Sequence, residues 1–129
     1  MGMKFFLLHG TVHFLIALTI SIVFKLDWFY FFLVLFFSAV VDLDHLPILF
    51  KRGFNYWYKI SWKAQRHQAY PLHNFLIVFI SFLGSFFILK NFLVGIFFLS
   101  VFLHLVWDLL RDIFILKMNI NHWNVKYQK

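Results

Sequence analysis

The sequence predicts a single-domain, all-α integral membrane protein with four transmembrane helices arranged as two hairpins. Of its 129 residues, 63% are hydrophobic and 21 are Phe, and the mean hydropathy is +0.81. Soluble domains are about 45–50% apolar, so this composition is not that of an ordinary soluble core. The chain also contains several apolar runs near the length that a helix needs to cross a bilayer. Helices satisfy their own backbone hydrogen bonds in lipid, and no alternating strand pattern competes with them.

Polar breaks divide the apolar sequence into four predicted spans. The first two spans are separated only by Lys25–Asp27, and the last two only by Lys90 and Asn91. Such short breaks indicate two tight helical hairpins, joined by the longer polar stretch 51–71 and followed by a tail over 111–129. The four spans cover about residues 3–24, 28–48, 72–89 and 92–110.

The distribution of Lys and Arg predicts the orientation in the membrane. With four spans, the two termini and the 51–71 loop share one side, which carries ten of the 12 basic residues. The opposite side carries the remaining two, Lys25 and Lys90. Because basic residues gather on the cytoplasmic side, we expect both termini to be cytoplasmic in a plasma or inner membrane. No A-x-A-like cleavage site follows the first apolar run, so we expect that run to be retained as a span.

The predicted cytoplasmic loop mixes aromatic and basic side chains, reading KRGFNYWYKISWKAQRHQAYP over 51–71. This mixture is typical of a segment at the membrane interface, with rings at headgroup level and cations on lipid phosphates. Similar mixtures also bind single-stranded nucleic acid. Beside four spans, however, we expect membrane lipids rather than nucleic acid as partners. The candidates for holding a phosphate or headgroup are Arg52, Lys63 and Arg66.

Most acids and histidines are concentrated in or beside the spans, at their predicted cytoplasmic ends. Only Asp27 and His122 lie elsewhere, and the chain contains no Glu and no Cys. Four separate segments therefore bring polar groups to one depth, provided that the first span begins near Leu8 so that His13 is level with the rest. The candidate metal ligands are His9, His13, Asp42, Asp44, His45, His67, His73, His104 and Asp108.

The spacing of these residues favours convergence on a metal. His9 and His13 are four residues apart, as are His104 and Asp108, so each pair shares a helix face. A charged group at the centre of a span costs about 2.5–3.5 kcal/mol, and a divalent ion stabilises several such groups at once. Donor sets of His and Asp without Cys suit Zn²⁺, Mn²⁺ or Fe²⁺, and we favour Zn²⁺ or Mn²⁺. Near the last pair, Arg111 and Asp112 are predicted as partners that orient the ligands.

The number of candidate ligands exceeds the four donors of a closed structural zinc site. We therefore expect an open catalytic site holding one or two ions, with some of these residues acting as partners of the ligands. Among them, Asp44 and His73 are predicted to carry protons as general base or acid.

The order of the motifs resembles that of a known family. A first span with His, then DLDH, RHQAYPLHN and HLVWD, resembles the small membrane-bound metal-dependent hydrolases, the YdjM-like or LexA-regulated inner-membrane proteins, and related archaeal membrane proteins of unknown function. The resemblance covers residues 9–108 by motif order. The third motif departs from the family, because Arg66 precedes His67, six residues separate the two histidines, and Asn74 stands where the family has Ser. The ligands that it implies are His13 or His9, Asp42, Asp44, His45, His67, His73, His104 and Asp108.

Three functions fit these observations. The first is a metal-dependent hydrolase at the cytoplasmic face, acting on a lipid or amphipathic phosphoester. The second is a non-catalytic subunit of a larger membrane complex, whose His/Asp cluster binds a structural metal or forms a polar network. The third, ion or proton translocation, is disfavoured because the outer halves of the spans carry no ionisable relay. The HxxxD motif also occurs in lipid phosphate phosphatases, but the Arg that they place before its His is missing here.

Overall fold

The computed structural model describes residues 2–47, 50 and 72–115, and the regular structure in these ranges is helical. This confirms the all-α prediction for the described residues. The predicted loop 51–71 and the tail from residue 116 onward lie outside them. In chain order the elements are α1 (Gly2–Phe24), α2 (Trp28–Ala39), the 3₁₀ turn η1 (Val40–His45), α6 (Phe75–Ser85), the 3₁₀ turn η2 (Phe86–Leu89), α7 (Phe92–Leu110) and the π-helical turn η3 (Arg111–Ile115).

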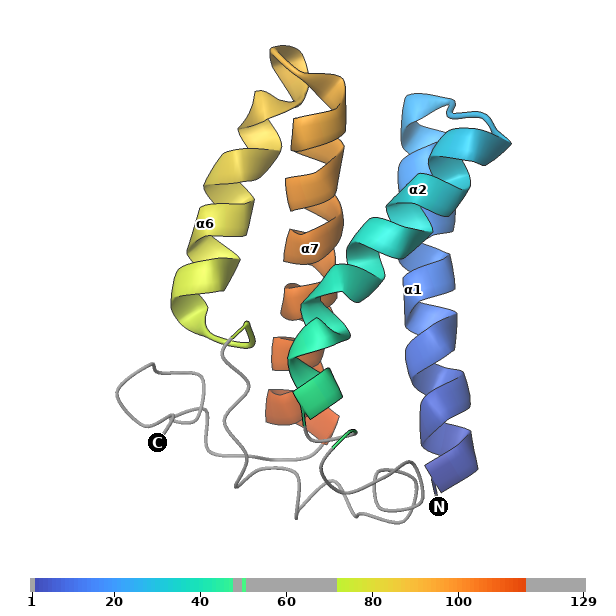
Figure 1. The fold of residues 1–129 in the computed structure, drawn as a ribbon, viewed down its shortest axis with the longest axis vertical. Helices are drawn as coiled ribbons and strands as arrows, with labels where there is room; N and C mark the ends of the chain where they lie inside the picture. The colour runs from blue at the N-terminus through green and yellow to red at the C-terminus, as the bar shows by residue number, and fades with distance from the viewer. Residues whose placement is uncertain (1, 48–49, 51–71, 116–129) are drawn as a thin grey trace.

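The helices form two hairpins that stand side by side, α1 with α2 and α6 with α7 (Figure 1). The tight turns of both hairpins lie at one end of the bundle, and the N-terminus lies at the other end, near the end of α7. Helix α2 runs obliquely across the bundle and packs against both α1 and α7. Its continuation η1, which carries the DLDH sequence, is thereby brought to the end of the bundle where α7 finishes.

Local chemistry explains the turn of the first hairpin. Lys25 has a φ of 52°, the left-handed conformation that commonly ends a helix, and the Leu26 N–H donates to the Ser21 carbonyl at 2.9 Å. The carboxylate of Asp27 then accepts a hydrogen bond from the Tyr30 N–H at 3.1 Å and caps the start of α2. Asp27, the acid that the sequence sets apart from the polar cluster, therefore has a structural role.

The second hairpin depends on two glycines where α6 and η2 lie close to α7. A Cβ atom at Gly95 would lie 2.2 Å from the backbone of Ile88, and one at Gly84 would lie 2.3 Å from the ring of Phe98. The Phe98 ring can turn aside, whereas the backbone at Ile88 moves only if the hairpin opens. Gly95 is therefore the position where this packing tolerates a side chain least.

We expect Gly95→Ala to destabilise the bundle, because overpacking a tight contact costs about 1–3 kcal/mol. The free energy of unfolding in mild detergent measures this effect. Gly10→Ala is the matched control, since a Cβ atom there meets nothing within 4 Å and Ala is the better helix former. Equal stability of the two variants would show that the described contact at Ile88 is wrong.

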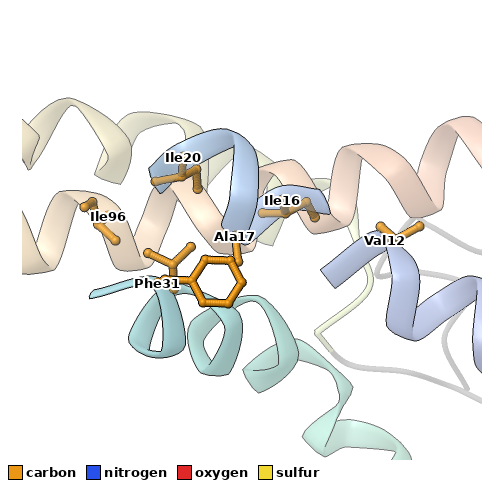
Figure 2. Close-up of a cluster of buried hydrophobic side chains, with 7 residues drawn as sticks. Val12, Ile16, Ala17, Ile20, Phe31 and Ile96 are labelled. Carbon is orange, nitrogen blue, oxygen red and sulfur yellow. The ribbon is translucent and has the colours of Figure 1, made fainter. Parts of the chain in front are cut away.

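The apolar core lies between α1, α2 and α7. Figure 2 shows side chains of α1 facing Phe31 from α2 and Ile96 from α7. A second buried cluster, Val41, Val101 and Leu105, connects η1 to α7 just beside the polar residues. Burying these side chains fixes the position of η1 on α7, and this determines where Asp42 lies. The α1 residues of the core are Val12, Ile16, Ala17 and Ile20.

The outer surface of the described helices is also apolar. Large side chains on every helix are exposed, for example Phe32 at 62% and Phe79 at 58%. One helical stretch, Phe92–Phe114, is long and apolar enough to cross a membrane, and a core helix of a soluble protein can pass the same test. The other three apolar helices are shorter by this measure, so the four-span prediction is supported in part: the helices are present, and their membrane insertion stays a prediction.

Candidate metal centre

Six of the predicted ligands meet at the end of the bundle that holds the N-terminus. They come from α1, η1, the residue before the cap of α6, and α7, so four segments far apart in the sequence contribute. Their donor atoms form two groups, within each of which all atoms lie within 4.8 Å of one another. The groups are His9, His13, Asp42 and His104, and Asp42, His73, His104 and Asp108.

The α1 side of the cluster is formed by two histidines on one helix face. His9 Nε2 lies 2.9 Å and His13 Nε2 lies 3.0 Å from the same atom, Asp42 Oδ2. Three donors this close together suit a shared ion, because ligands about 2.0–2.2 Å from a metal are about 3 Å from one another. The expected alignment of His13 with the rest of the cluster is therefore present.

Ser38 contacts His13 on the side away from Asp42 and is not among the site residues predicted from the sequence. Its hydroxyl is fully buried, donates to the Leu35 carbonyl at 2.8 Å and accepts from His13 Nδ1 at 3.0 Å. A proton held on Nδ1 leaves Nε2 as the metal-binding atom, as outer partners of metal-bound histidines commonly arrange. The sequence signal that could have identified Ser38 is its position four residues before Asp42, which would place both on one side of a continuous helix. Serines in apolar helices usually bond their own backbone, which makes that signal weak.

The α7 side of the cluster is more deeply buried. Asp108 Oδ2 lies 3.0 Å from His73 Nε2 and 3.2 Å from His104 Nε2. The side chain of His104 is 0% exposed and that of Asp108 is 2% exposed. His73 directly precedes Asn74, whose side chain caps α6 by accepting from the Ile77 N–H at 3.0 Å. Asn is among the preferred capping residues, so Asn74 fixes the start of α6 directly after His73.

Asp42 lies between the two sides, with one carboxylate oxygen toward each. Oδ2 faces the α1 histidines, whereas Oδ1 lies 3.6 Å from His104 Nε2 and 3.9 Å from His73 Nε2. Oδ1 is buried and accepts no hydrogen bond among the described residues. Leaving a buried carboxylate oxygen without a partner costs free energy, and a metal ion would supply the missing interaction. The residues present therefore fit a divalent metal.

Arg111 and Asp112, predicted as partners of the ligands, lie behind Asp108. Arg111 Nη1 donates to Asp108 Oδ1 at 2.5 Å, and its Nε and Nη2 donate to Asp112 Oδ1 at 3.1 and 2.9 Å. The guanidinium thus occupies one oxygen of Asp108 and leaves Oδ2 toward the histidines. This arrangement fixes which oxygen of Asp108 is offered to a metal.

We expect Arg111→Lys to lower metal affinity by about 10–100-fold, the usual effect of losing a partner that orients a ligand. Lys keeps the positive charge but lacks the planar fork that contacts both carboxylates. Competition against a chelator in detergent measures the dissociation constant. Lys90→Arg at the opposite end of the bundle serves as the control. An unchanged affinity in Arg111→Lys would show that Asp108 needs no such positioning.

The remaining predicted residues are less well placed or lie outside the described part. His45 Nδ1 lies 3.9 Å from Asp42 Oδ1, and its ring meets that of His73 edge to face at 5.1 Å between centroids, but His45 belongs to neither donor group. The assignments that fall outside the described residues, and so stay predictions, concern the Asp44 side chain, Arg52, Lys63, Arg66 and His67.

Fold and site together define an α-helical bundle with a buried His/Asp cluster that fits a divalent metal. In comparisons with known proteins, no family model, no curated protein and no solved structure matches the chain. The resemblance to the small membrane-bound metal-dependent hydrolases consequently rests on motif order alone.

Proposed function

We propose that this protein is a membrane-embedded, metal-dependent hydrolase that acts on a phosphoester of a lipid or amphipathic molecule at the cytoplasmic face. The observation that carries the proposal is Asp42, a half-buried carboxylate that is shared by two groups of donors and whose buried Oδ1 accepts no hydrogen bond among the described residues. Membrane insertion, the metal and the reaction are separate parts of this proposal, and each has its own support.

The membrane part is supported by the apolar surface. Soluble monomers rarely expose large contiguous apolar patches, whereas here large apolar side chains are exposed along all four helices. In a bilayer these faces would contact lipid. The cluster would then lie at the cytoplasmic end, because the N-terminus and the end of α7 are at that end of the bundle and carry predicted cytoplasmic charge.

The chemical part is supported by the type and placement of the donors. Imidazoles and carboxylates suit Zn²⁺ or Mn²⁺, and a bound ion of this kind supplies Lewis acidity and a water whose pKa is lowered toward about 7. The α1 histidines and Asp42 would hold the ion, and Ser38 would fix the proton of His13. Asp44 stays the candidate base, and His45, beside Asp42 but outside both donor groups, is a further candidate for proton transfer.

The substrate part is supported by the position of the cluster in the chain. In the sequence, the cluster residue His73 lies two residues after the end of the basic loop 51–71. The loop residues Arg52, Lys63 and Arg66 are proposed to hold the phosphate, since Arg and Lys are the usual partners of phosphate oxygens. A phosphoester on a membrane lipid would carry its anionic group to this level.

The second candidate function is a non-catalytic subunit whose cluster holds helices together. It is favoured by one observation: contacts of 2.9–3.3 Å between neighbouring histidines and aspartates already join all six residues into one network. Such a network can stabilise a bundle without chemistry, and the exposed Phe side chains would then contact partner subunits.

Hydrolysis by purified protein separates the two functions. We expect phosphoesterase activity on short-chain phospholipid analogues in detergent, lost with a chelator and restored by Zn²⁺ or Mn²⁺. His45→Gln is expected to lower the rate of hydrolysis more than it lowers metal affinity. His45 lies outside both donor groups, so its loss removes a candidate for proton transfer but no ligand. Protein that binds metal but hydrolyses no phosphoester in such a screen would favour the subunit function.

A further inference from the structure

We infer that the cluster is built for two ions, with Asp42 as the ligand that bridges them. This inference rests on the metal-binding part of the proposed function, and it does not depend on the reaction. The two donor groups share Asp42 and His104, and each has two members of its own. His9 and His13 belong to the α1 group only, and His73 and Asp108 belong to the α7 group only.

Distances argue against one ion that takes all six residues. Two donors on one ion lie at most about 4.2–4.4 Å apart, because each bond is about 2.1 Å long. The six donors fall into two groups rather than into one compact set. One ion can therefore draw its ligands from one group, but it leaves the two members unique to the other group without a metal.

The two oxygens of Asp42 are aimed in the way that a bridge requires. Oδ2 is the atom that both α1 histidines approach, at 2.9 and 3.0 Å. Oδ1 is directed toward His104 and His73, at 3.6 and 3.9 Å, and accepts no hydrogen bond from a described residue. A carboxylate that offers one oxygen to each of two ions is the usual way in which hydrolytic sites place metals about 3.5–4 Å apart.

The two ions would be held unequally. The α7 group supplies four donors, including the carboxylates of Asp42 and Asp108, and His104 is fully buried. Apart from the shared His104, the α1 group supplies His9, His13 and the bridge, and the His9 side chain is 17% exposed. With fewer donors and only one carboxylate, the α1 group would bind its ion more weakly than the α7 group and would leave coordination positions on that ion open. The α1 ion is therefore the more weakly bound one and the one with room for water or substrate.

Proton positions impose one further condition. His13 Nδ1 and His104 Nδ1 lie 3.3 Å apart. Binding both ions through Nε2 places a proton on both Nδ1 atoms, and two N–H groups cannot point at each other across this contact. Because Ser38 already keeps the His13 proton in place by accepting it, the His104 ring must turn when its Nε2 binds an ion.

The test is a titration of metal-free, full-length protein in detergent with Mn²⁺, followed by calorimetry and by electron paramagnetic resonance. We expect two equivalents with affinities at least about tenfold apart. The signal of the first ion should give way to that of an exchange-coupled pair when the second binds. His9→Gln is expected to retain the tight ion and lose the weak one. Asp27→Asn, a control at the opposite end of the bundle, should retain both.

The outcomes separate this inference from the proposed function. One equivalent in the wild type, or two equivalents without exchange coupling, would overturn the bridged pair and leave a metal-dependent hydrolase intact. No bound Mn²⁺ or Zn²⁺ in folded protein would overturn metal binding itself. Loss of both ions in His9→Gln, with the helical circular dichroism unchanged, would contradict the unequal division of ligands.

Discussion

Asp42→Asn is expected to lower metal affinity by at least about 100-fold and to abolish metal-dependent hydrolysis. The reason is geometric: Asp42 belongs to both donor groups and presents a different oxygen to each. Loss of a partner that only orients a ligand already costs about 10–100-fold, so loss of a shared charged ligand should cost more. Chelator competition and the phosphoesterase rate measure the two effects.

The matched control for this change is Asp27→Asn. Asp27 caps α2 at the opposite end of the bundle, and Asn is an equally good cap, so affinity, rate and stability should all be retained. If Asp42→Asn bound metal as tightly as Asp27→Asn, the assignment of Asp42 as the central ligand would have to be abandoned.

Asp108→Ala is expected to destabilise the protein more than any other ligand substitution. Asp108 is buried against Arg111, whose guanidinium donates to its Oδ1. Removing one member of a buried ion pair costs about 3–5 kcal/mol, because the other charge stays buried without its partner. Asp112 still pairs with Arg111 and should moderate the loss toward the lower end of that range.

The double variant Asp108→Ala/Arg111→Met separates the stability effect from metal binding. It removes both charges, so the free energy of unfolding should recover in part, while metal affinity should stay as low as in Asp108→Ala. The single variant Arg111→Met completes the comparison. If the loss of stability in the double variant equals the sum of the losses in the two single variants, the two side chains are not coupled. That outcome would contradict the described contact.

The helices could be predicted from sequence because long apolar runs and short polar breaks are local signals. The predicted span 92–110 coincides with α7 (Phe92–Leu110), and the predicted span 3–24 differs from α1 (Gly2–Phe24) by one residue. The third span is predicted to begin at residue 72, whereas α6 begins at Phe75 because Asn74 caps it. A capping side chain can place the start of a helix a few residues later than the start of the apolar run, and the hydrophobic pattern does not reveal this shift.

The arrangement of the site depends on tertiary geometry that no local pattern contains. The second span is predicted over 28–48, and the chain is helical through most of it, but α2 ends at Ala39 and continues as the 3₁₀ turn η1, which contains Asp42. The tighter turn changes the direction of the side chains, so Asp42 faces both α1 and α7 while His45 lies at the edge. Helical spacing predicted the pairs within each helix, such as His104 with Asp108. It could not predict that Ser38 would support His13, because that contact depends on how α2 crosses α1.

The most direct test of the central claim is the metal content of the purified wild-type protein, measured by elemental mass spectrometry after reconstitution with Zn²⁺ or Mn²⁺ and removal of excess ion. Metal binding by the cluster predicts one to two equivalents of transition metal per chain, lost when Asp42 and Asp44 are both replaced by Ala. A folded wild-type protein that retains no metal after reconstitution would contradict it, and the cluster would then be a hydrogen-bonded network that holds the helices together.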